Sequence, residues 1–210
     1  MPIDPHADVP SPIDLRAMRD AAQWADEVSA KRPCRPKFFE VFARELGALP
    51  QGVGTLLELG SGPGFLAQFL LAHITSSRYI ALDFSEAMHV LARERLGSAA
   101  TVVEFVTRDF REPDWADGLP PASAVVTLQA VHELRHKRRA AAFYSQVASV
   151  LKPGGLFLMC DHYCGIGAMA NDALYMSEAE HVAALASSGL KGVACIHKEG
   201  GMVLYRAELA

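Results

Sequence analysis

The feature that most constrains the fold of this chain is a glycine-rich turn between an apolar run and a helical pattern. The turn spans residues 60–64, has glycines at Gly60, Gly62 and Gly64, and follows the apolar residues 55–59. Glycines at such a turn permit positive φ and let a ligand approach the backbone closely. In an open parallel sheet, a turn of this kind lies at the carboxyl ends of the strands, where ligands bind. The sequence therefore predicts an α/β fold with a ligand site at this turn.

Short apolar runs alternate with helical patterns along the rest of the chain. Five runs read as parallel strands that are buried on both faces: 55–59, 79–82, 102–106, 124–128 and 156–160. Two later runs, 192–196 and 202–207, read as a hairpin that turns at Gly200-Gly201. Ser85, and Ser177 with Glu180, are expected to cap helices, and the segment 152–155 is expected to end one. This alternation predicts a doubly wound sheet with helices on both faces and one antiparallel strand near the end.

The region before the first strand has a different character. Four prolines in the first twelve residues predict a loose tail. Two helices are expected to follow, one over residues 13–30 and one that starts near Pro36. We expect residues 1–50 to form this tail and a helical segment that serves either as a lid or as plain packing.

Composition excludes several classes of protein. The chain of 210 residues has a net charge of -4, and the basic cluster 137–139 is short, so no nucleic-acid partner is expected. No signal peptide and no membrane-length apolar run is visible. Four cysteines are too few for a disulfide scaffold and read as reduced thiols, which favours a cytoplasmic location.

Two cofactors suit the turn: a dinucleotide and S-adenosylmethionine. Asp83 ends the second strand and is expected to accept bonds from two ribose hydroxyls, while Phe84 is expected to lie against adenine. Glu58 stands just before the turn, where a carboxylate repels a pyrophosphate and suits the ammonium of a methionine moiety. The spacing Gly-x-Gly-x-Gly also departs from the dinucleotide pattern. Both points favour S-adenosylmethionine.

Five segments between residues 54 and about 162 resemble, in order and spacing, the motifs of the class I S-adenosylmethionine-dependent methyltransferases. They are 56–67, 79–88, 108–110, 124–134 and 150–157. The resemblance implies a seven-stranded sheet of order 3-2-1-4-5-7-6 with strand 7 antiparallel, and a methyltransferase domain at 51–210. It also implies that Asp109 meets the adenine amine. The cofactor-binding residues expected from motif and resemblance together are Glu58, Gly60, Ser61, Gly62, Gly64, Asp83, Phe84, Met88, Asp109, Phe110, Gln129 and Ala130.

Two patterns imitate metal sites. Residues 132–136 match the His-Glu-x-x-His pattern of zinc proteases, which requires both histidines one turn apart on a helix. Here His132 follows a strand almost directly, and His136 is expected at the surface. Cys160, His162 and Cys164 alternate closely, but no second ligand pair of matching spacing exists. We expect no metal.

The sequence predicts methyl transfer to a small molecule by in-line displacement, and it leaves the catalytic residues open. His132, Asp161 and His162 are weak candidates for a base because they follow strand ends. Residues 161–173 are expected to form a mobile substrate loop. A non-catalytic S-adenosylmethionine-binding module and an NAD-dependent oxidoreductase remain as alternatives. The acceptor, its reactive atom and the oligomeric state stay open.

Overall fold

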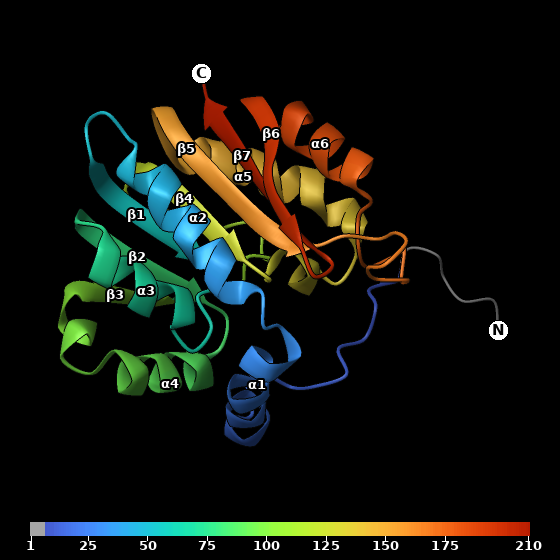
Figure 1. The fold of residues 1–210 in the computed structure, drawn as a ribbon, viewed down its shortest axis with the longest axis horizontal. Helices are drawn as coiled ribbons and strands as arrows, with labels where there is room; N and C mark the ends of the chain where they lie inside the picture. Colours follow the sequence, from blue (N-terminus) through green and yellow to red (C-terminus); the bar gives the residue numbers. More distant parts are fainter. Residues whose placement is uncertain (1–6) are drawn as a thin grey trace.

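A twisted sheet of seven strands forms the centre of the molecule in the computed structural model, which describes residues 7–210 (Figure 1). The strands follow the order β3-β2-β1-β4-β5-β7-β6, and β7 is antiparallel to both of its neighbours. The predicted fold, strand order and closing hairpin are confirmed. The strands are β1 (Val53–Leu59), β2 (Ser76–Asp83), β3 (Val103–Thr107), β4 (Ala122–Leu128), β5 (Leu151–His162), β6 (Leu190–Glu199) and β7 (Met202–Leu209).

Helices cover both faces of the sheet, because successive strand side chains point to opposite sides. Leu56 of β1 packs in a core with α2 and α3, whereas Leu57 packs in a second core with α5 and α6. In Figure 1 these two pairs of helices lie in front of and behind the strands. The helices are α1 (Met18–Lys31), α2 (Arg35–Gly47), α3 (Phe65–His73), α4 (Glu86–Leu96), α5 (Ala140–Val150) and α6 (Glu178–Ser187). The 3-10 turns are η1 (Gly97–Val102), η2 (Val131–Leu134) and η3 (Lys137–Arg139).

Two helices begin at the capping residues that the sequence predicts. Ser85 caps α4 by accepting the Met88 N–H at 3.2 Å, and Ser177 with Glu180 forms a full capping box at α6. The predicted fifth strand begins earlier than expected, at Leu151, because this residue pairs with Ala122 ahead of a register shift.

The N-terminal region departs from the prediction at two points. Helix α1 begins at Met18 rather than near residue 13, because the Asp14 carboxylate accepts the Arg16 N–H and holds a turn there. The prediction of a loose tail is wrong for residues 8–10. The Val9 N–H donates to the Arg135 carbonyl, and the Arg135 guanidinium donates to the carbonyls of Val9 and Pro10. Residues 1–6 of the predicted tail lie outside the described residues.

Surface charges are largely paired near the basic cluster. Lys137 pairs with Glu180, and Arg138 and Arg139 pair with Asp8. No helix within residues 7–210 is both long and apolar enough to cross a membrane. All four cysteines are free thiols.

Candidate active site

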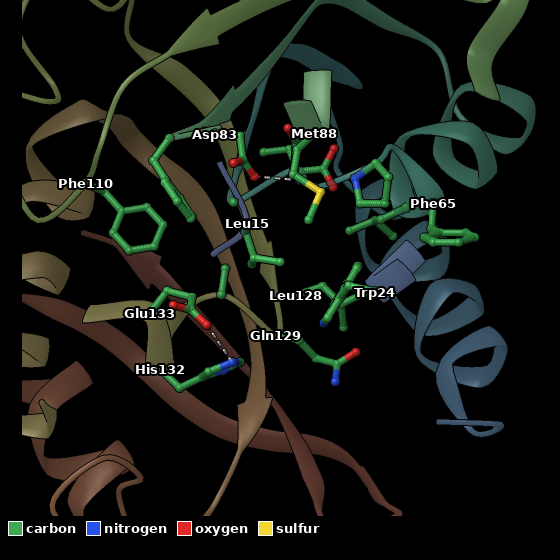
Figure 2. A pocket seen from close by; sticks show the side chains of 18 of the residues that line it. Leu15, Trp24, Phe65, Asp83, Met88, Phe110, Leu128, Gln129, His132 and Glu133 are labelled. Atoms are coloured by element: carbon green, nitrogen blue, oxygen red, sulfur yellow. Dashed lines mark hydrogen bonds and ion pairs between the residues drawn. The ribbon is translucent and has the colours of Figure 1, made fainter. Parts of the chain in front are cut away.

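A pocket lies at the carboxyl ends of β1, β2 and β4, where the strand order reverses. It encloses about 640 Å³ of space, some of it open to solvent. Ten of the twelve predicted cofactor-binding residues line it: Glu58, Gly60, Ser61, Gly62, Asp83, Phe84, Met88, Phe110, Gln129 and Ala130. Figure 2 shows Asp83 and Met88 on one side of this pocket and His132, Glu133 and Gln129 on the other.

The glycine turn fits closely against the neighbouring loop. Gly60 has φ of 66°, and a Cβ built on it would lie 2.2 Å from the Cβ of Ala130. Gly62 has φ of 54°, but nothing lies within 4 Å of the place where its Cβ would be. Gly60 is therefore required for packing, while Gly62 leaves open space beside the pocket. The third glycine, Gly64, does not line the pocket and instead precedes α3 in a left-handed conformation.

Asp83 is a buried carboxylate that both shapes the turn and faces the pocket. Its Oδ2 accepts the Gly62 N–H at 2.8 Å, and its Oδ1 accepts the Ser85 N–H at 2.9 Å. Burial raises the pKa of Asp83 to about 6, against the opposing effect of these two bonds. A carboxylate has about four acceptor positions. Each oxygen of Asp83 thus retains the capacity to accept one further bond from a ligand.

Glu58 and Arg35 lie together at the other end of the pocket. Glu58 is 2 % exposed, and its carboxylate accepts the Tyr79 hydroxyl at 2.7 Å. Burial raises the pKa of Glu58 to about 8. Arg35, at the start of α2, is also buried, and burial lowers its pKa to about 10. Its Nε and Nη1 are buried and have no hydrogen-bond partner. A buried guanidinium with two unused donors is costly unless a ligand supplies an acceptor.

Three pocket residues come from the N-terminal region and were not predicted as site residues: Leu15, Trp24 and Arg35. Figure 2 shows Leu15 and Trp24 reaching into the middle of the pocket. The Leu15 carbonyl accepts the Ser85 hydroxyl at 2.5 Å, and the Arg16 guanidinium lies 4.6 Å from the centre of the Phe84 ring. No motif marks these residues, because their placement depends on how α1 and α2 pack against the rest of the molecule.

The structure does not bring Asp109 into this pocket. Arg111 and Arg16 both bind its carboxylate, at 2.6 and 3.1 Å. Against the effect of burial, the bond to Arg111 lowers the pKa of Asp109. Asp109 lines an adjoining hollow under residues 8–16 instead.

A histidine–aspartate pair lies at the edge of the pocket, just beyond the carboxyl end of β4. The Nδ1 of the His132 ring lies 2.7 Å from the Asp161 Oδ1, and the backbone N–H of His132 donates to the Asp161 Oδ2 at 2.8 Å. On its other side, the His132 Nε2 lies 3.5 Å from Glu133. Burial opposes protonation of His132, but the two carboxylates outweigh it and raise its pKa. Burial alone would raise the pKa of Asp161, but His132 and the backbone N–H of His162 lower it to about 2.

His162 is held in its neutral form. Burial lowers its pKa to about 4. Its Nδ1 faces the Gly201 carbonyl at 3.4 Å, and its Nε2 lies 3.0 Å from the Gln129 side-chain nitrogen. Gln129 itself has φ of 55°, which is rare for a residue other than glycine, and its Oε1 is buried without a partner. Strained backbone of this kind is typical of functional sites.

The His-Glu-x-x-His pattern does not form a metal-binding helix. His132 lies in η2, whereas His136 caps η3, where its Nδ1 accepts the Arg138 N–H. The prediction that His136 is at the surface is wrong, because the residue is buried. Among the residues that the structure describes, no group of three or more His, Cys, Asp or Glu side chains is arranged to hold a metal ion.

The predicted substrate loop is shorter than expected. Asp161 and His162 belong to β5, so the connection to α6 begins at Tyr163. Within it, the Met169 N–H donates to the Tyr163 carbonyl and Gly165 donates to the Met169 carbonyl. Met169 and Tyr175, on this connection, line a second cavity beside His132.

Comparison with known proteins agrees with this geometry. Residues 56–155 match a family model described as a methyltransferase domain. A sterol 24-C-methyltransferase (ERG6A) of Gibberella zeae is 26% identical over 188 residues, which cover 82% of this chain and 47% of that protein. This chain thus spans about half the length of that curated relative.

Solved structures show the same fold at low identity. The human N-acetylserotonin methyltransferase in complex with SAM superposes with a TM-score of 0.68 at 15% identity, over 93% of this chain and 57% of the other. The CurJ carbon methyltransferase gives a TM-score of 0.71 at 15% identity, over 99% and 61%. Residues 56–155 thus match a methyltransferase domain, and the strand order and superpositions show that the chain has the class I methyltransferase fold, which supports S-adenosylmethionine as the cofactor.

Proposed function

We propose that this chain methylates a hydroxyl oxygen of a small molecule, with His132 as the general base. The observation that carries the proposal is the His132–Asp161 pair at the junction of two cavities. A hydroxyl is a weak nucleophile until it loses its proton, so an oxygen acceptor benefits from a positioned base. A thiolate or a neutral amine would need less help.

The unpaired polar atoms of the pocket support the placement of the cofactor. We infer that Asp83 accepts the two ribose hydroxyls, that Glu58 pairs with the methionine ammonium, and that Arg35 binds the methionine carboxylate. The buried, unused donors of Arg35 match an anionic group with two oxygens. Phe84, Met88 and Phe110 line the opposite end, which suits an adenine ring.

The same residues orient the reaction. S-adenosylmethionine supplies an electrophilic methyl group on a positively charged sulfur. Neutral His132 donates its Nδ1–H to Asp161, which leaves Nε2 free to accept the hydroxyl proton. The hydroxyl proton would then reside on His132, and the acceptor oxygen would take up the methyl group that the bound cofactor would supply. Asp161 and Glu133 stabilise the resulting imidazolium.

The alternatives find less support. A non-catalytic binding module is favoured when apolar side chains fill the space beyond the methyl position. Here that space is a cavity with histidine, glutamine and charged side chains in its walls. For NAD, the buried Glu58 acid lies against the glycine turn where a pyrophosphate would bind.

The test is the variant Asp161→Asn, because Asp161 lies behind His132 and outside the cofactor pocket. The rate of S-adenosylhomocysteine release with hydroxyl acceptors should fall on the order of 100-fold or more, as expected for a lost general base. The affinity for S-adenosylhomocysteine, measured by calorimetry, should stay unchanged. Wild-type activity should also fall at low pH, because protonated His132 cannot accept a proton, and its raised pKa moves this loss to higher pH. Unchanged turnover in Asp161→Asn contradicts the base.

A further inference from the structure

A second cavity lies beside the cofactor pocket, between α1 and the ends of β4 and β5. It encloses about 580 Å³ of space, some of it open to solvent. It shares Trp24, Gln129 and His132 with the cofactor pocket. A molecule in this cavity would therefore meet the His132 end of the cofactor pocket directly. Its lining residues are Trp24, Glu27, Val28, Lys31, Arg32, Gln129, His132, His162, Met169 and Tyr175.

The charges on the walls of this cavity are unevenly paired. Glu27 is the one carboxylate among these lining residues, and Lys31 and Gln23 both donate to it. Arg32 donates to the Lys31 carbonyl, but its Nε is buried without a hydrogen-bond partner. Within residues 7–210, Arg32 also forms no ion pair. The cavity thus contains a guanidinium whose charge no protein carboxylate neutralises.

The opposite wall cannot neutralise this guanidinium either. His162 is neutral, because burial and the positive charges of His132 and Arg32 lower its pKa to about 4. Asp161 and Glu133 contact His132 at its Nδ1 and Nε2, and neither of them lines this cavity. Between the two ends, aromatic rings form the walls, with Tyr175 5.7 Å from His132 and 5.9 Å from His162 between ring centres.

We infer that the methyl acceptor is a small planar hydroxy acid whose carboxylate binds Arg32 while its hydroxyl faces His132. An arginine fork matches a carboxylate in shape and charge, and an incompletely solvated guanidinium gains most from such a partner. Trp24 and Tyr175 would contact the flat apolar part of the acceptor. A cationic acceptor would find its possible partner, Glu27, already bound by Lys31. This inference rests on the proposed function, since it assigns the substrate class of the same site.

The test compares acids with their neutral esters. The probes are 2-, 3- and 4-hydroxybenzoate and 4-hydroxycinnamate, each with its methyl ester, which vary the distance from hydroxyl to acid. Affinity is measured by calorimetry with S-adenosylhomocysteine present, and methylation by S-adenosylhomocysteine release. At least one acid should bind and be methylated. The affinity of its methyl ester should be roughly 10- to 100-fold lower, as expected for the loss of a charge-assisted bond.

Variants separate Arg32 from general electrostatics. Arg32→Gln should abolish the preference for the acid and leave ester binding unchanged, and Arg32→Lys should restore part of it. Arg19→Gln is the matched control, since Arg19 is exposed on α1, the helix that Arg32 directly follows, and lines neither cavity. Thermal midpoints show that each variant is folded.

Several outcomes overturn the inference. They are an ester that binds as tightly as its acid, no binding by any of the four acids, or an acid preference that survives in Arg32→Gln. Failure of the proposed function looks different, because S-adenosylhomocysteine would then fail to bind, or neutral acceptors would react at the same rate in Asp161→Asn as in the wild type.

Discussion

The pocket is built by two regions that differ in how their residues are placed. The first region consists of the last residues of β1, β2 and β4 and the residues just after them, namely 58–62, 83–88 and 128–133. The hydrogen-bonded sheet fixes their positions. Leu15, Trp24 and Arg35 come from the N-terminal region, which reaches the pocket through packing and a few side-chain bonds. The sheet therefore fixes the pocket groups at the strand ends, whereas side-chain contacts position those of the N-terminal region.

The largest effect on the cofactor is expected at a strand end, in Asp83→Ala. The change removes both proposed ribose acceptors and the bond to the Gly62 N–H. Each charge-assisted bond is worth roughly 1.5 to 3 kcal/mol, so S-adenosylhomocysteine affinity should fall on the order of 100-fold. Calorimetry and the thermal midpoint are measured on the same variant. A lower midpoint with unchanged affinity would mean that Asp83 only orders the turn and the start of α4.

The second prediction concerns Arg35 in the N-terminal region. Arg35→Met keeps the approximate length of the side chain and removes the buried charge. Affinity for S-adenosylhomocysteine should fall roughly tenfold or more, as expected for a lost charge-assisted bond. Methylthioadenosine, which lacks the amino-acid part, should bind equally well to the variant and the wild type. The midpoint of the unliganded protein should not fall, because two buried donors without hydrogen-bond partners are removed. Equal losses for both ligands would contradict a carboxylate-binding role.

The third prediction concerns Glu58, near the end of β1, and the pH dependence of the free energy of unfolding. The pKa of Glu58 is raised to about 8, so folding favours its protonated form. This contribution to stability is complete below the ordinary carboxyl pKa and is lost as pH rises to about 8. Between pH 6 and 8, above the pKa of Asp83, unfolding free energy should fall with a slope of up to about 1.4 kcal/mol per pH unit.

Glu58→Gln should flatten that slope, as measured by denaturant unfolding at several pH values. Binding of the methionine ammonium requires ionised Glu58, so wild-type affinity for S-adenosylhomocysteine should rise over the same interval and the variant's should not. An identical pH dependence in both proteins would assign the effect to other groups.

The smallest effect is expected from Arg16→Gln. The Arg16 side chain is 53 % exposed, although it contacts Phe84 and Asp109. Exposed ion pairs contribute about 0–1 kcal/mol, so cofactor affinity should fall no more than about fivefold, and less at high salt. Arg19→Gln serves again as the control on α1. A loss as large as that of Asp83→Ala would mean that the N-terminal region dominates cofactor binding.

The same contrast explains how much the sequence could predict. The strand runs, the glycine turn and the closing hairpin are local signals, so the fold and ten pocket residues followed from them. Asp109 has the expected position in the chain, but Arg16 and Arg111 bind it, and no local pattern encodes that contact. Arg35 carried no signal, since its role depends on α2 packing over β1. His136 shows the same limit, because tertiary packing buries a residue in a polar segment.

The bonds that hold residues 8–10 link one wall of the adjoining hollow with the position of His132. Arg135 holds Val9 and Pro10 through its backbone and its guanidinium, and it follows η2, which carries His132 and Glu133. Any opening that lifts this segment must break those bonds and release the end of η2. The attachment of residues 8–10 and the alignment of His132 are therefore thermodynamically coupled, and such coupling is reciprocal. A change that strengthens the attachment of residues 8–10 would therefore also favour the position that η2 gives to His132.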